Sequence, residues 1–143
     1  MTIRAAAVIL ALVTVPTRAA SSQVTDTHPS ELEGLWAHQG KPDSVGNVQW
    51  AVIHFEPDGR YRGAQVLVRK SVPERQGEVT EGRWAVVVSQ PRGALLCSRR
   101  EGADKSRCNS YRLGGARRAL TWDTLTFVPA DSALIRSLKL DGL

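Results

Sequence analysis

The stretch Phe55-Glu56-Pro57-Asp58-Gly59-Arg60-Tyr61 decides the fold of this chain, because it places a tight turn between two apolar runs. Residues 48–56 and 60–69 flank the turn and carry apolar side chains at alternating positions, which is the period of a β-strand. If residues 57–59 form a three-residue loop with Gly59 in the left-handed conformation, Glu56 faces Arg60 and Phe55 faces Tyr61. The sequence therefore predicts an antiparallel β-hairpin.

The hairpin lies between two copies of a short signature, Gly34-Leu35-Trp36 and Gly82-Arg83-Trp84. Glycine and proline clusters, including Val72-Pro73-Glu74, separate short segments of two-residue periodicity. A cap at Asp131 and an apolar stripe at Leu134, Ile135 and Leu138 predict a short C-terminal helix. We expect an all-β fold, a small antiparallel meander β-barrel of about seven or eight strands, with strands at residues 34–38, 48–56, 60–69, 82–89, 94–99, 107–113 and 120–128.

Both faces of the hairpin are apolar, which is unusual for a sheet with one face in water. Trp50 faces Val66 in the predicted register, on the side opposite to Phe55 and Tyr61. Either the C-terminal helix covers the outer face or the register slips at a bulge. We expect Phe55 and Tyr61 to point inward.

The N-terminal segment has the composition of an export signal. Arg4 precedes an apolar run from Ala5 to Val15, and small residues follow near Ala19 and Ala20. We expect a signal peptide at residues 1–20, a flexible lead-in at 21–30 and one barrel domain at 31–143. The run is too short for a transmembrane helix, which needs about 20 residues, and it is followed by no lipid-anchor cysteine. The predicted location is periplasmic or secreted.

Two cysteines, Cys97 and Cys108, lie in the exported part, where an oxidising compartment favours their pairing. We expect one disulfide directly across an antiparallel pair, with Leu96 beside Asn109 and the residues between the cysteines forming an exposed tip.

The order of these motifs, from the first Gly-x-Trp through the Phe-x-Pro-Asp-Gly-x-Tyr hairpin to Leu120-Thr121-Trp122, resembles the small exported lipocalin-like (calycin-type) domains of bacteria. The resemblance covers residues 31–129, and the same spacing suits avidin-like and protease-inhibitor barrels. It implies that Trp36 packs at the closed end of the barrel. The candidates for the arginine that accompanies this tryptophan in lipocalins are Arg117 and Arg118.

Catalytic and metal-binding signatures are missing from the sequence. It has no Gly-x-Ser-x-Gly, phosphate-binding glycine loop or His-Glu-x-x-His, and the spacing of His28, His38 and His54 matches no metal site. We expect no enzyme activity, cofactor or metal.

Charge is concentrated in residues 92–118, which contain eight basic and two acidic residues, a net +6. Such a concentration favours an anionic envelope component or an acidic protein as partner. A single tyrosine in the segment is no stacking platform, so nucleic acid is not expected. The candidate surface comprises Arg99, Arg100, Lys105, Arg107, Arg117 and Arg118.

Large aromatic side chains in a small barrel usually fill its core. The sharper alternative is that Trp50, Tyr61, Trp84 and Trp122 line a cavity mouth for an apolar small molecule or lipid. The sequence thus leaves two noncatalytic functions open: a module that binds an apolar ligand, and an interaction or inhibitor barrel that uses its basic, disulfide-stapled hairpin.

Overall fold

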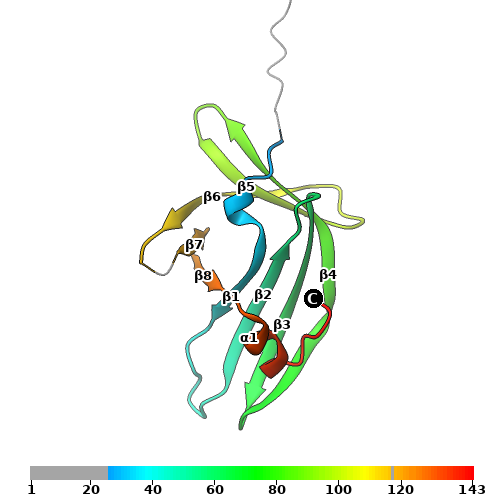
Figure 1. The fold of residues 1–143 in the computed structure, drawn as a ribbon, viewed down its shortest axis with the longest axis vertical. Helices are drawn as coiled ribbons and strands as arrows, with labels where there is room; N and C mark the ends of the chain where they lie inside the picture. Colours follow the sequence, from blue (N-terminus) through cyan, green and yellow to red (C-terminus); the bar gives the residue numbers. More distant parts are fainter. Residues whose placement is uncertain (1–25, 117) are drawn as a thin grey trace, which may run out of the picture.

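The computed structural model describes residues 26–116 and 118–143 as an eight-stranded antiparallel barrel (Figure 1). Consecutive strands pair with one another, and β8 returns to β1 to close the barrel. The strands are β1 (Gly34–Gln39), β2 (Val48–Phe55), β3 (Arg60–Arg69), β4 (Val72–Ser89), β5 (Gly93–Arg100), β6 (Arg107–Gly114), β7 (Ala119–Trp122) and β8 (Leu125–Pro129). The predicted fold class is confirmed.

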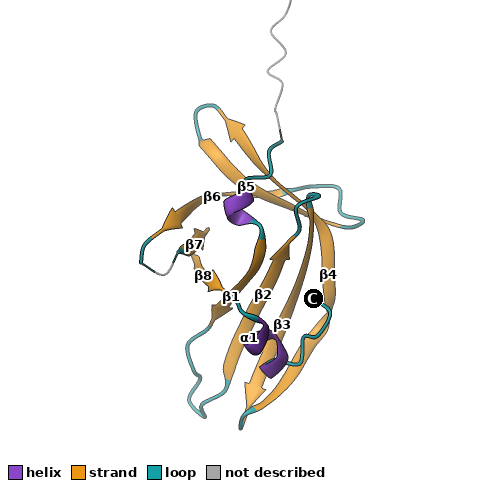
Figure 2. Cartoon of the chain, in the orientation of Figure 1, coloured by secondary structure: helices purple, strands orange, loops and turns teal. Residues whose placement is uncertain are grey.

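Two short helical segments accompany the barrel (Figure 2). The 3-10 helix η1 (Ser30–Leu32) leads into β1, and the α-helix α1 (Ser132–Ser137) follows β8. As predicted, Asp131 caps α1, and its carboxylate accepts a hydrogen bond from the amide of Leu134 at 2.8 Å.

The β2–β3 hairpin has the predicted register. Phe55 lies opposite Tyr61 and Trp50 lies opposite Val66. Gly59 has a φ of 85°, and the Asp58 carboxylate accepts a hydrogen bond from the amide of Arg60 at 3.0 Å. The turn chemistry alone thus fixes which residues of the two strands meet.

The disulfide prediction is also confirmed. Cys97 and Cys108 lie directly opposite each other on β5 and β6, with their Cα atoms 4.1 Å apart, and they form a disulfide. Leu96 lies beside Asn109 as expected.

Two predicted boundaries were wrong. Val72-Pro73-Glu74 belongs to β4. The turn lies immediately before it, at Lys70 and Ser71, both of which have a positive φ. β4 pairs only with β3 as far as Glu81, and an edge segment of this kind tolerates a proline. The predicted strand 120–128 is divided by a turn at Asp123, whose φ is 57°. Aspartate adopts this conformation without the glycine that usually signals it.

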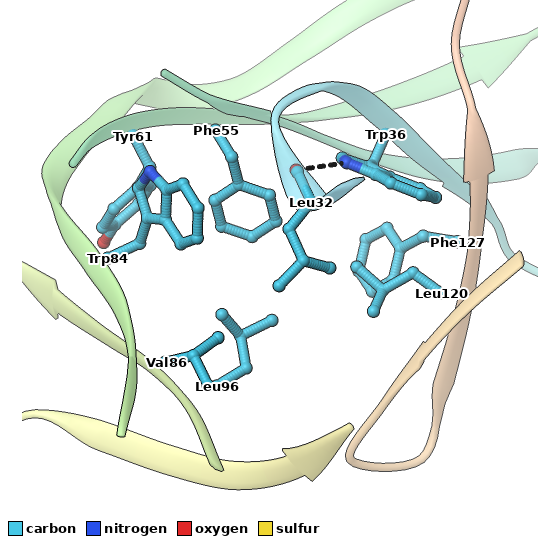
Figure 3. Close-up of a cluster of buried hydrophobic side chains, with 9 residues drawn as sticks. All are labelled: Leu32, Trp36, Phe55, Tyr61, Trp84, Val86, Leu96, Leu120 and Phe127. Atoms are coloured by element: carbon cyan, nitrogen blue, oxygen red, sulfur yellow. Dashed lines mark hydrogen bonds between the residues drawn. The ribbon is translucent and has the colours of Figure 1, made fainter. Parts of the chain in front are cut away.

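The barrel interior is filled by one apolar cluster, which we call the inner cluster (Figure 3). Its members come from η1 and from strands all around the barrel. Leu32 lies between the rings of Phe55 and Trp84 on one side and the rings of Trp36 and Phe127 on the other. The members of the cluster are Leu32, Trp36, Phe55, Tyr61, Trp84, Val86, Leu96, Leu120 and Phe127. Phe55 and Tyr61 therefore point inward, as predicted.

The outer face of β1, β2 and β3 carries a second cluster, which we call the outer cluster. Val52 and Val66 on the strands pack there with Ile135 and Leu138 from the C-terminal segment. The register of the β2–β3 pair is regular. The outer apolar face of the hairpin is therefore covered by the C-terminal helix, and no register slip between β2 and β3 is needed to explain it.

The two Gly-x-Trp signatures have different local roles. Gly34 has a φ of +112°, a conformation that other residues rarely adopt, and no neighbour lies where a side chain would project. Gly82 lies opposite Tyr61, and a Cβ at Gly82 would come within 2.7 Å of Tyr61 Cε1 and 2.9 Å of Arg100 Cα. The first glycine permits a backbone conformation and the second permits close packing.

Residues 1–25 and Arg117 lie outside the described residues, so the predicted signal peptide and residues 21–25 of the lead-in are not described. Thr27 pairs with Val86 on β4 through two backbone hydrogen bonds. The imidazole Nε2 of His28 lies 2.9 Å from the carbonyl oxygen of Trp84. These contacts attach the end of the lead-in to the barrel.

Candidate functional site

Three arginines lie next to one another on adjacent strands, just after the β2–β3 turn. Arg60 on β3 faces Arg83 on β4, and Arg83 faces Arg99 on β5. All three side chains are exposed. Directly opposed residues have Cβ atoms about 5 Å apart, and like charges in such pairs destabilise a sheet. We therefore expect the opposed arginines, which we call the arginine row, to lower the stability of the sheet.

The charges of the row are unequally compensated. Arg60 Nε lies 2.7 Å from Asp58 Oδ2 and 3.7 Å from Glu56 Oε2. The Arg60 amide and guanidinium, as hydrogen-bond donors, lower the pKa of Asp58. Within the described part of the chain, neither Arg83 nor Arg99 forms an ion pair. Two opposed guanidinium groups thus remain available to an anion.

The row borders an open groove of about 890 Å³, which we call the arginine groove. The β2–β3 hairpin, β4, β5 and the β5–β6 loop form it, and Figure 1 shows this loop beside the β2–β3 turn. Its lining residues are Glu56, Arg60, Tyr61, Arg62, Glu81, Gly82, Arg83, Arg99, Arg100, Glu101, Gly102, Ala103 and Asp104.

Tyr61 joins the inner cluster to the arginine groove. Its hydroxyl oxygen lies at the edge of the cluster in Figure 3, and the residue is 9% exposed. Burial raises the pKa of the Tyr61 phenol, and the positive charge of Arg100 offsets part of that increase. The hydroxyl therefore stays protonated at neutral pH and can donate a hydrogen bond to an anion.

A fourth arginine of the groove is already engaged. Arg62 Nη2 donates to Glu56 Oε1 at 3.2 Å, and Arg62 Nη1 donates to the carbonyl oxygen of Gly142. Arg62 thus ties the C-terminal segment to the hairpin, and we assign it no ligand.

The structure does not bring the four predicted ligand-binding aromatics together. Trp50 packs on the outer cluster, whereas Tyr61 and Trp84 belong to the inner cluster and Trp122 packs against it. The indole N–H of Trp84 donates to the carbonyl of Glu56 at 2.9 Å, and that of Trp122 to the carbonyl of Leu96 at 3.2 Å. These bonds satisfy the indole donors within the protein.

The predicted basic surface is also divided. Arg99 and Arg100 line the arginine groove, whereas Lys105 in the β5–β6 loop and Arg107 at the start of β6 are not among its lining residues.

At a separate position, Arg118 Nη2 donates to the carbonyl of Glu31 in η1 at 3.0 Å. The neighbouring carbonyl, that of Leu32, accepts a hydrogen bond from the indole N–H of Trp36 at 2.8 Å. Arg118, one of the two candidates for the partner of Trp36, thus lies at the same helical turn. Arg117, the other, is outside the described residues.

Sequence reasoning missed Arg60 and Arg83. Arg60 follows the turn and Arg83 is the middle residue of the second Gly-x-Trp, so both lay within recognised motifs. They lie opposite each other because of the β3–β4 register. That register could not be predicted, because the start of β4 was placed at the wrong residue.

No three histidine, cysteine, aspartate or glutamate side chains among residues 26–116 and 118–143 are grouped as a metal site. Over the same residues, no helix is long and apolar enough to cross a membrane.

Neutralising the row is expected to stabilise the folded chain. Arg99→Gln removes one like-charge pair and Arg83→Gln removes two, and we expect each substitution to raise the free energy of unfolding by roughly 0.5 kcal/mol in a buffer of small monovalent ions. Urea unfolding at low salt measures this change, and about 1 M salt should reduce the difference because the Debye length falls to about 3 Å. Arg112→Gln, on the exposed face of β6, is the matched control. A loss of stability confined to the row variants would contradict the interpretation.

A solved structure, the crystal structure of lipoprotein YedD from Klebsiella pneumoniae subsp. pneumoniae MGH 78578, is similar in fold. The similarity covers 82% of this chain and 87% of that chain, with 12% sequence identity and a TM-score of 0.48. No protein-family model matches the chain, and no curated protein matches it in sequence. A likeness at this level says nothing about what the chain binds, and membership of the lipocalins stays a prediction.

Proposed function

We propose that this protein is an exported, noncatalytic binding module that holds an anionic group of its partner at the arginine groove. The observation that carries the proposal is the opposed pair Arg83 and Arg99, two exposed guanidinium groups without an ion-pair partner in the described part of the chain. Guanidinium groups donate paired hydrogen bonds that match the geometry of carboxylate and phosphate. An anion between them would remove the repulsion that the row imposes.

The filled interior supports a surface site over a cavity for an apolar ligand. Trp36 and Trp84 are each 2% exposed and Phe55 is 1% exposed, and they pack at the centre of the inner cluster. A barrel of eight strands is narrow enough for its own side chains to fill. Of the two functions that the sequence leaves open, the interaction barrel therefore fits this structure better.

The chemistry of the arginine groove supports a noncatalytic role. Its titratable lining residues are arginines, carboxylates and Tyr61, and no serine, cysteine or histidine lines it. Nucleophilic catalysis usually needs a nucleophile beside a base. The excess of arginines over carboxylates in the lining suits the groove to holding an anion.

Inorganic phosphate, as the minimal anionic probe, should stabilise the folded chain. At a concentration ten times its Kd, bound phosphate adds about 1.4 kcal/mol to the free energy of unfolding. We expect this gain at constant ionic strength for the natural chain and its loss in the Arg83→Gln/Arg99→Gln double variant. The control is Arg112→Gln/Arg136→Gln, which removes the same charge from exposed positions outside the groove. Equal gains in both double variants would overturn the proposal.

Export is supported by the charged, apolar and small-residue regions at positions 1–20. When the full chain is expressed in a Gram-negative host, mass spectrometry of the periplasmic fraction should find a chain that begins at Ala20 or Ser21. An uncleaved chain that stays in the cytoplasm would contradict this part of the proposal.

A further inference from the structure

A second groove borders the arginine groove. That groove has a volume of about 380 Å³ and is also lined by Arg83 and Arg99, so the two grooves meet at this pair. Arg83 and Arg99 thus lie at the shared border of the two grooves, which we together call the furrow, and a ligand that crosses this pair contacts both grooves.

Acidic side chains lie on both sides of the central arginines. Glu101 and Asp104 line the first groove, and Asp26 and Asp58 line the second. All four are exposed, and only Asp58 forms an ion pair within the described residues, with Arg60. The first groove also holds Glu81 and Arg100, so its charged side chains that form no ion pair in the described part of the chain, other than Arg83 and Arg99, are three carboxylates and one arginine. Both sides of the central arginines therefore carry an excess of negative charge.

This order disfavours a uniformly acidic partner. A polyanion centred on Arg83 and Arg99 would place its outer charges beside Glu101, Asp104 or Asp26, where like charges repel. A ligand with one anionic centre and cationic flanks meets the excess of opposite charge in both grooves.

The wall of the second groove adds apolar contacts. Trp84, Ala85, Val87 and the cysteines of the disulfide line it beside the charged groups. A free phosphate ion has no group to place against this wall. A protein segment offers acidic, basic and apolar side chains together.

Resting on the proposed function, we propose that the furrow binds an extended segment of another protein that carries a central aspartate or glutamate flanked by lysine or arginine. The central carboxylate lies between the guanidinium groups of Arg83 and Arg99. Glu101 follows the end of β5, two residues after Arg99, and two residues of an extended ligand span about 6.6 Å. A basic residue two to four positions from the central acid therefore reaches the acidic end of the furrow.

Selection from a displayed library of random peptides about ten residues long, which span about 33 Å when extended, tests the inference. The full mature chain is the bait, and the Arg83→Gln/Arg99→Gln variant is used for counter-selection. We expect enriched peptides to share one acidic residue with a basic residue two to four positions away. Synthetic copies should bind the natural chain at least about 10-fold more tightly than the double variant.

A charge reversal at one end of the furrow tests the charge pattern separately. In Glu101→Lys/Asp104→Lys the acidic end becomes basic, so the enriched peptides should gain acidic flanks. Both substitutions lie at exposed positions of the β5–β6 loop, and circular dichroism checks that each variant stays folded.

Enrichment of uniformly acidic or purely apolar peptides would overturn the inference, as would arginine-dependent binding to phosphatidylglycerol vesicles without any peptide selection. If phosphate stabilises the natural chain through Arg83 and Arg99 while no zwitterionic peptide is selected, the proposed function stands and this inference falls. If neither phosphate binding nor peptide binding depends on Arg83 and Arg99, the proposed function and this inference are both overturned.

Discussion

Gly82→Ala is expected to destabilise the barrel by about 3 kcal/mol or more, at the upper end of the usual cost of overpacking. The added Cβ would collide with the carbonyl oxygen of Arg99 and lie 2.9 Å from the Cα of Arg100 and 2.7 Å from Tyr61 Cε1. Two of these contacts involve the backbone of β5, which cannot rotate away. The substitution therefore pushes β4 from β5 or expels Tyr61 from the inner cluster.

Gly114→Ala provides the control. Gly114 also lies in a strand, its φ is outside the left-handed region, and no atom lies within 4 Å of the added Cβ. We expect its free energy of unfolding to stay within about 0.5 kcal/mol of the natural value. Urea unfolding followed by circular dichroism, with the disulfide intact, measures both variants. Similar values for Gly82→Ala and Gly114→Ala would mean that the close approach at Gly82 is not a requirement of the fold.

Trp84→Ala should cost about 3–5 kcal/mol, the usual range for removing a buried aromatic side chain. Its ring centroid lies 5.0 Å from that of Phe55, and its indole N–H holds the carbonyl of Glu56 at the β2–β3 turn. The substitution leaves a cavity in the inner cluster and an unpaired carbonyl in the hairpin that carries Arg60. We therefore expect losses in stability and in anion binding together.

Trp50→Ala tests the contribution of the outer cluster, for comparison with that of the inner cluster. Trp50 is partly exposed and packs on the outer cluster beneath the C-terminal segment, so we expect a smaller loss of stability and unchanged phosphate binding. Circular dichroism is the suitable probe, because each substitution removes a fluorescent residue. If Trp50→Ala were the more damaging variant, the barrel would not be built around the inner cluster.

The local features of this fold could be read from the sequence. The Pro-Asp-Gly turn fixed the register of Phe55 and Tyr61, the cap at Asp131 located α1, and the spacing of Cys97 and Cys108 matched an antiparallel pair. Each depends on residues that are close in the chain. Turn and cap chemistry act over a few residues and do not need the rest of the fold.

The candidate site could be read only in part, because it depends on pairing between distant segments. Arg99 was recognised through the charge of its segment. Arg60 and Arg83 become its neighbours only through the registers of β3 with β4 and β4 with β5, and β4 extends ten residues before its predicted start. Alternation along the hairpin did place Trp50 on the face opposite to Phe55 and Tyr61, as the structure has it.

Under the proposed function, the arginine row is a binding surface that lowers the stability of the fold. Packing of the inner cluster and the close approach at Gly82 position β4 and β5 firmly enough to hold Arg83 opposite Arg99. Natural proteins commonly retain locally unfavourable groups at binding sites. The predicted gain in stability on neutralising the row, coupled with loss of anion binding, is the signature of that arrangement.

The most direct test of the arginine groove is an NMR titration of the natural chain with inorganic phosphate at constant ionic strength. The measurement follows the side-chain Nε–H resonances of the arginines and the indole N–H resonances of Trp36 and Trp122. The proposed function predicts saturable shifts at Arg83 and Arg99 with one common Kd, and no shift at Arg112 or at either indole. Uniform shifts across all arginines, or saturable shifts at the indoles of Trp36 and Trp122, would contradict it.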